Sequence, residues 1–108
     1  PVVADYYSGM EVTVPVKGLN AGVAEVKKIF FEYYEGQKMV EVKESLDDGG
    51  FIAANKLQGT NKLNITVTGN DENILLVALY DNLGKGASGA AIQNMNIMLG
   101  LDEEKGLV

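Results

Sequence analysis

The sequence predicts an α+β fold in which helices cover a mixed, mainly antiparallel sheet. Several short segments alternate apolar and polar residues as half-buried strands do, and two longer segments repeat apolar residues at helical spacing. These segments follow one another in the order strand, helix, several strands, helix. Apolar residues make up 46% of the 108 residues and charged residues 22%, which is typical of a folded globular domain.

The first expected elements are a strand over residues 10–16 and a helix that begins near residue 23. Pro15 cannot donate a hydrogen bond to a neighbouring strand, so we expect this strand to lie at an edge of the sheet or to end there. Gly36 is expected to end the helix. The apolar residues of the strand are Met10, Val12, Val14 and Val16, and those of the helix are Val23, Val26, Ile29, Phe30, Tyr33 and Tyr34.

Further strands are expected over residues 40–43, 63–68 and 74–80. The last of these is apolar throughout, as a central strand covered on both faces would be, and we expect it to form a hairpin with residues 63–68. Residues 51–57 are open to two interpretations, a short strand or irregular structure. A final helix is expected over residues 86–99, and the glycine that follows it directly is expected to end it.

The composition excludes several kinds of partner and site. The net charge is −6 and arginine does not occur, so no nucleic acid partner is expected. Cysteine and histidine are also missing, which excludes a disulfide, a thiolate nucleophile and a Cys/His zinc site. Without a long apolar run or a signal peptide, we expect a cytoplasmic protein that does not enter a membrane. Acidic clusters at residues 47–48, 71–72 and 102–104 lack calcium-loop spacing, so we expect solvated turn charges and no metal site.

A glycine-rich segment follows the last strand. Gly84, Gly86 and Gly89 have the G-x-G-x-x-G spacing that permits a tight turn and close approach to a pyrophosphate in dinucleotide-binding folds. A Rossmann unit also needs a second parallel strand after the helix, and only residues 101–108 remain for it. The spacing alone therefore does not predict an independent Rossmann site.

The final helix has two faces of different character. Small residues and one amide recur at i, i+3, i+4 and i+7: Gly86, Gly89, Ala90 and Gln93. A separate apolar face carries Ile92, Met95 and Leu99. The small residues have two possible explanations. They allow either tight packing on the sheet or the close approach of a second backbone or a flat ligand. Lys85 is either a phosphate or carboxylate contact or a flexible surface charge.

The chain ends in two distinctive segments, residues 81–96 (Asp-Asn-Leu-Gly-Lys-Gly-Ala-Ser-Gly-Ala-Ala-Ile-Gln-Asn-Met-Asn) and 100–107 (Gly-Leu-Asp-Glu-Glu-Lys-Gly-Leu). Both are similar to the terminal motif of the N-acetyl-gamma-glutamyl-phosphate reductases, so that from residue 81 onward the sequence resembles that family. Gly59-Thr60-Asn61 before a strand is similar to a Gly-Ser/Thr-Asn element of the family. The resemblance covers nearly the whole chain and is loosest over residues 43–57.

The resemblance implies a two-domain parent of the semialdehyde-dehydrogenase type that binds NADP(H) in a Rossmann domain. In such enzymes of arginine biosynthesis a cysteine attacks an acyl phosphate, hydride gives N-acetyl-glutamate semialdehyde, and a histidine is the acid/base. Both residues are expected upstream of Pro1, and the chain itself has no catalytic residue. The resemblance further implies a substrate and dimerisation domain over residues 1–84, a homo-oligomer, and a terminal helix and tail over residues 85–108 that lie on the cofactor domain, with Gly86, Ala87 and Gly89 near the cofactor.

Two alternatives are weighed against this family. The acidic, compact composition allows a small non-catalytic α+β module that senses a ligand or binds a partner. The related aspartate-semialdehyde dehydrogenases have a similar glycine–alanine helix. Residues 93–96 and the Gly-Leu ending at residues 106–107 fit the arginine-pathway family better.

The chain alone is expected not to reduce an acyl phosphate with NADPH, because it has neither a thiolate nor an imidazole to carry the chemistry. NADPH should also bind weakly, because the net charge of −6 repels a polyanion. The measurement is NADPH oxidation at high protein concentration with and without the acyl phosphate. Substrate-dependent turnover that scales with protein concentration would contradict the prediction.

Overall fold

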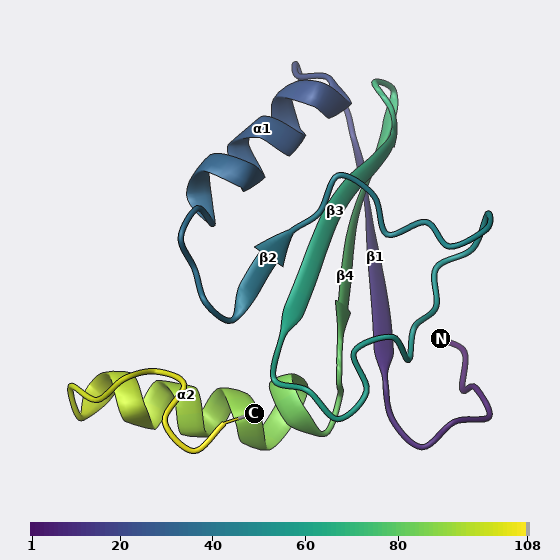
Figure 1. Ribbon diagram of the computed structural model, residues 1–108. Helices are drawn as coiled ribbons and strands as arrows, with labels where there is room; N and C mark the ends of the chain where they lie inside the picture. The colour runs from purple at the N-terminus through teal and green to yellow at the C-terminus, as the bar shows by residue number, and fades with distance from the viewer. Residues whose placement is uncertain (108) are drawn as a thin grey trace.

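A computed structural model of the chain describes residues 1–107 and contains one four-stranded sheet with two helices (Figure 1). Among these residues no helix has the length and apolar character needed to cross a bilayer. The elements in chain order are β1 (Met10–Lys17), α1 (Val23–Tyr33), β2 (Val40–Val42), β3 (Leu63–Asn70), β4 (Asn73–Tyr80), a π-helical turn η1 (Gly84–Ser88) and α2 (Gly89–Met98).

The strand order is β1-β4-β3-β2, which confirms the mixed, mainly antiparallel sheet. β3 and β4 form the predicted hairpin, whose turn is held by the side chain of Asn70: its Oδ1 accepts hydrogen bonds from the backbone N–H groups of Glu72 and Asn73. β1 pairs antiparallel with β4 and lies at the edge, as Pro15 predicts. β2 pairs parallel with β3 and forms the other edge.

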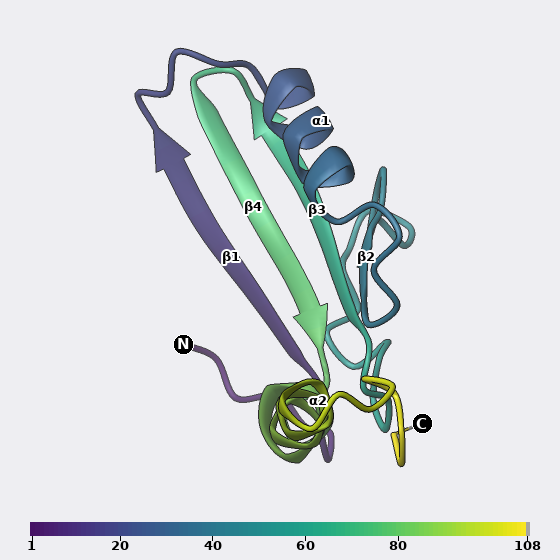
Figure 2. The ribbon, with the colours of Figure 1, turned by 90° about the vertical axis from the view of Figure 1, so that its left-hand side faces the viewer.

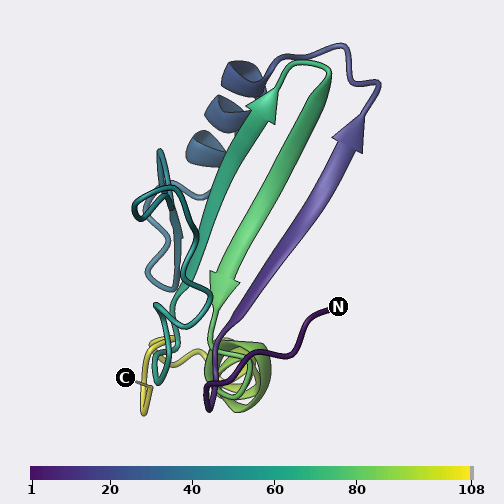
Figure 3. The ribbon, with the colours of Figure 1, turned by 90° about the vertical axis from the view of Figure 1, so that its right-hand side faces the viewer.

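Two small apolar clusters lie on opposite faces of the sheet. On one face Val26 of α1 packs against Val67 and Ile74. On the other face Leu46 packs against Val77 and Leu79 of β4. Figure 2 shows α1 over the first face, and Figure 3 shows that an irregular segment, residues 43–62, lies on the second. The sequence of β4 is apolar throughout because side chains on both of its faces contribute to these clusters.

Several boundaries differ from the sequence-based expectation. Residues 51–57 form no strand: Asp48 and Phe51 make an isolated bridge, and turns follow. α1 ends at Tyr33, and Gly36 reverses the chain with a φ of 75°. The last helical segment begins at Gly84 rather than near residue 86, because its first turn is π-helical. α2 then runs across the ends of the strands instead of covering a face of the sheet (Figure 2).

Substitution of Gly69 tests the geometry of the hairpin. Its φ is 98°, and a Cβ there would clash with the carbonyl oxygen of Asn73. Gly69→Ala is expected to lower the free energy of unfolding by about 2–4 kcal/mol, through backbone strain and steric overlap together. The control is Gly49→Ala, whose φ is 63° and whose Cβ would meet nothing, with an expected loss of about 1 kcal/mol. Urea denaturation measures both, and equal losses would contradict the clash.

Candidate functional site

The motif that begins at residue 81 is built around the carboxylate of Asp81, which is only 2% exposed. Its Oδ2 accepts hydrogen bonds from the hydroxyl of Ser8 at 2.8 Å and from the backbone N–H of Gly59. Its Oδ1 accepts hydrogen bonds from the backbone N–H groups of Leu83 at 2.7 Å and Gly84 at 2.9 Å. One side chain thus joins the N-terminal segment, the 54–60 loop and the turn into η1.

The same hydrogen bonds set the charge state of Asp81. The backbone N–H of Gly59 contributes most, and together with Gly84, Ser8 and Leu83 it lowers the pKa of Asp81 to about 2, although burial acts in the opposite direction. The carboxylate is therefore ionised at neutral pH. The next residue adds one more tie, because Oδ1 of Asn82 accepts a hydrogen bond from the N–H of Gly9 at 2.8 Å.

The glycines expected near a cofactor make close contacts within this chain. A Cβ on Gly86 would lie 2.9 Å from the ring of Tyr80, and a Cβ on buried Gly89 would collide with the side chain of Asn61. Tight packing within the domain thus accounts for both positions. Gly86 and Ala87 also keep an exposed side, which leaves their outer surface open to a second body.

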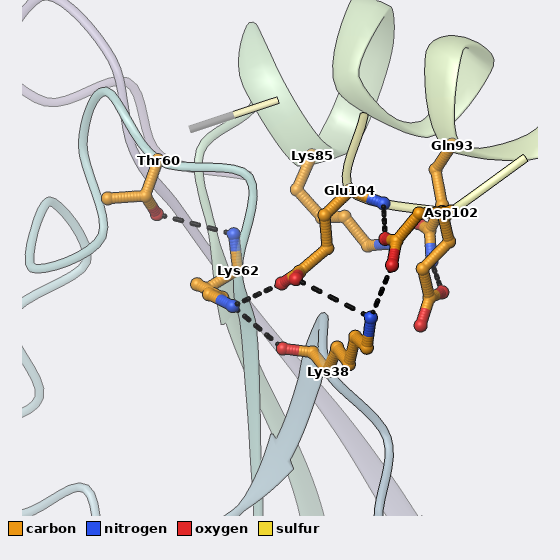
Figure 4. A network of polar contacts seen from close by, with 8 residues as sticks. Lys38, Thr60, Lys62, Lys85, Gln93, Asp102 and Glu104 are labelled. Carbon is orange, nitrogen blue, oxygen red and sulfur yellow. Dashed lines mark hydrogen bonds and ion pairs between the residues drawn. The ribbon is translucent and has the colours of Figure 1, made fainter. Parts of the chain in front are cut away.

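Lys85 points along α2 toward Gln93, as Figure 4 shows, and its Nζ donates a hydrogen bond to Oε1 of that amide. The amide nitrogen of Gln93 in turn donates to Oε2 of Glu103 at 2.8 Å. Burial lowers the pKa of Lys85, and the charge of Glu103 partly offsets this effect. Lys85 is therefore not a free surface charge but part of a chain of polar contacts alongside α2.

The acidic clusters take part in local structure more than expected. Asp47 Oδ1 accepts a hydrogen bond from the N–H of Gly50 within its turn, and Asp71 Oδ1 accepts one at 2.9 Å from the N–H of Val23, the first residue of α1. Asp102 pairs with Lys38 at 2.8 Å. This hydrogen bond is the main cause that raises the pKa of Lys38 and lowers that of Asp102. Within residues 1–107 the carboxylates form no group able to hold a metal ion.

The other notable surface is the part of the sheet that α1 leaves uncovered. Val12, Val14 and Val16 stand opposite Ala78, Leu76 and Ile74 of β4, on the face that carries α1. α1 lies above β3, and β1 extends beyond it, as Figure 2 shows. The side chain of Val14 is consequently 48% exposed. The expectation that β1 is half-buried within the chain is wrong: its apolar face is open.

The adjoining flank of α1 is apolar too. Phe31 and Lys27 line the grooves beside β2 and Glu44, so the opposite flank, which carries Ile29 and Tyr33, lies toward β4 and β1. Tyr33 is 76% exposed and Ile29 is also exposed, although both are among the apolar residues that the sequence places at helical spacing. Tyr33 rests edge-on against Tyr34, which stacks on Phe30. The uncovered surface of β1 and β4, together with this flank, is here named the open face.

Fold and open face define the chain as an α+β domain with an apolar surface left open to a second body. Residues 1–82 match the family model described as "Semialdehyde dehydrogenase, dimerisation domain", and the chain belongs to this family. Among curated proteins, it is 45% identical over 118 aligned residues to N-acetyl-gamma-glutamyl-phosphate reductase 2 of Nostoc sp., covering 99% of this chain and 37% of that protein. It is 43% identical to the N-acetyl-gamma-glutamyl-phosphate reductase of Brucella anthropi, covering 93% of this chain and 35% of that protein.

These comparisons confirm the resemblance that the terminal motif predicts. They favour the reductase family over a sensing module and over an aspartate-semialdehyde dehydrogenase. The chain spans little more than a third of the length of the relatives it matches. Sequence reasoning missed the roles of Asp81, Ser8 and Lys38. For Asp81 a local signal did exist, because an aspartate lies directly after a buried strand and just before a glycine-containing turn. Aspartate side chains in that position often accept hydrogen bonds from the backbone of the turn. The other two have no local signal.

Asp81 is expected to make stability depend on pH. Because its pKa falls from 3.8 in the unfolded chain to about 2 in the folded one, its contribution is present above pH 4 and is lost as the pH falls through 2. The shift corresponds to about 2 kcal/mol. Asp81→Asn should remove this acid dependence and lower stability at pH 7 by about 2 kcal/mol or more, because an amide cannot accept all four hydrogen bonds. Urea denaturation between pH 2 and pH 7, with Asp5→Asn at an exposed site as control, measures this. An unchanged pH profile in Asp81→Asn would contradict it.

Proposed function

We propose that the chain is the dimerisation part of an NADPH-dependent acyl-phosphate reductase, and that its open face binds the same face of a second copy. The observation that carries the proposal is an apolar sheet surface left exposed beside an apolar helix flank. A contiguous exposed apolar patch on a folded domain marks an interaction site. A face that binds its own copy about a twofold axis needs only one such patch. The family name of the matched domain supports the same assignment.

The parent reaction follows from the relatives' printed name. A reductase acting on N-acetyl-gamma-glutamyl phosphate converts an acyl phosphate to an aldehyde, and arginine biosynthesis uses this step. We place this activity in the cytoplasm, with the thiolate, the acid/base and most NADP contacts supplied from outside these 108 residues. The lack of cysteine and histidine in the chain supports this division of labour.

The terminal helix is proposed to face the cofactor domain. Residues 1–84 would form the substrate and dimerisation domain, and residues 85–108 the helix and tail that border the nucleotide. Gly86 and Ala87 have an exposed outer side that supports close approach of another backbone or of the cofactor. Gly89 would act by close packing, because it is buried against Asn61. The exposed Met95, Met98 and Leu99 give α2 an outer apolar surface for the neighbouring domain.

Charge placed on the open face should prevent association. Wild-type chain is expected to be a dimer at high micromolar concentration in sedimentation equilibrium, and Val14→Lys should weaken the dimer at least about tenfold, because a buried unpaired ammonium costs several kcal/mol. Val14 is half-exposed in the single chain, so the fold should tolerate the lysine.

Thr13→Lys is the matched control, because Thr13 is exposed on the same strand but on the opposite face. It should dimerise as the wild type does. A clean monomer of 11.6 kDa for the wild type would contradict the proposal. So would equal weakening in both variants, because that result indicates pairing through the edge of β1 rather than through the open face.

A further inference from the structure

α2 has little apolar attachment to the sheet that it crosses. Of its residues only Gly89 and Asn96 are buried, and among residues 1–107 neither apolar cluster of the sheet includes a residue of α2. Met98 is 86% exposed. Figure 1 shows the helix extending away from the strands beyond β2. Apolar side-chain packing along the helix therefore contributes little to fixing its direction.

The chain after α2 turns back and runs alongside the helix. Gly100 reverses the backbone with a φ of 67°, and the N–H of Leu101 donates to the carbonyl of Asn96 at 2.9 Å. The amide nitrogen of Asn96 donates to the carbonyls of Glu103 at 3.2 Å and Lys105 at 2.9 Å. With its side chain buried, Asn96 ties the returning segment to the helix. Residues 101–107 are here named the strap.

The strap meets the sheet through two lysines that lie far apart in the sequence. β2 and β3 run parallel with Val40 opposite Leu63, so Lys38 and Lys62 come together at the beginnings of the two strands. The Nζ of Lys62 donates to the carbonyl of Lys38 at 2.7 Å.

Both lysines hold carboxylates of the strap, as Figure 4 shows. Lys38 lies 2.8 Å from Asp102 and 3.9 Å from Glu104, and Lys62 lies 3.2 Å from Glu104. A single exposed ion pair is worth roughly 0.2–1 kcal/mol, but several that share partners act together.

We propose that residues 101–107 form an electrostatic strap that docks α2 on the sheet, so that α2 and the strap can detach as one unit while the sheet stays folded. The contacts are polar and solvent-accessible, and high salt screens such contacts more than apolar packing. Segments with few buried apolar contacts open at lower free energy than the core around them. The strap thus gives α2 two states, docked and released, whose balance depends on ionic strength.

Native-state hydrogen exchange followed by mass spectrometry tests the strap. In Lys38→Met/Lys62→Met, amides of α2 and residues 101–107 should exchange about three- to thirtyfold faster, with β3 and β4 unchanged. Asp102→Asn/Glu104→Gln should give the same result from the side of the strap, with β2 and β3 left untouched. Salt raised from 0.05 M to 1 M should accelerate exchange of the same segments in the wild type and have little effect in either double variant.

The control is Lys28→Met, which removes an exposed lysine paired with Glu32 on α1, away from the strap, and should leave α2 unchanged. The charge swap Lys38→Asp with Asp102→Lys should restore protection that Lys38→Asp alone removes. Equal exchange of α2 in wild type and both double variants would overturn the proposal. So would acceleration of α2, β3 and β4 together, because that would mean that α2 is not a separate unit. Neither outcome depends on dimerisation through the open face.

Discussion

The buried carboxylate of Asp81 is the interaction on which the arrangement of this chain most depends. Removing an ionised carboxylate from water costs several kcal/mol unless hydrogen bonds replace the lost hydration. Here the replacing donors come from Ser8, Gly59 and the turn that follows β4, so three segments must be in place together for the charge to be tolerated. The same turn sets the start of η1, since the N–H of Gly86 donates to the carbonyl of Asp81 at 2.8 Å. The course of the chain into α2 therefore begins at this charge.

The strands and helices were largely predictable because each is encoded by a local repeat. Period-two alternation identified β1 and β3, and the unbroken apolar run identified β4 as central. Alternation cannot tell which body covers an apolar face, however. The exposed Val14 and Tyr33 occur in the same local patterns as the buried Val67 and Val26. Only the position of α1 above β3 determines which of these side chains are covered. Residues 51–57 form no strand, and Leu57 packs against the cluster of Leu46, Val77 and Leu79, a long-range contact that no local pattern predicts.

The candidate site was predicted by its motif but not by its contacts. The spacing of Gly84, Gly86 and Gly89 pointed to close approach, and the surfaces that approach turned out to include Tyr80 and Asn61 of this chain. Each of these three glycines thus has a close neighbour within the domain. The lysine pair that holds residues 101–107 depends on the register of a parallel pairing between strands about twenty residues apart, which no local pattern reports. Long-range placement, rather than local preference, explains what sequence reasoning missed.

The distribution of burial links folding to assembly. Among residues 1–107 the most fully enclosed large side chains, Ile74, Leu79, Val67 and Val77, all belong to the β3–β4 hairpin. A domain of this size with so small an enclosed core is marginally stable by itself. The apolar surface that would enlarge the core lies instead on β1, on one flank of α1 and on α2, where only a second body can cover it. Under the proposed association, binding of a second copy stabilises the folded chain by mass action, so stability should rise with protein concentration. Because α2 is held by polar contacts rather than by this core, its attachment should depend far less on concentration than the sheet does.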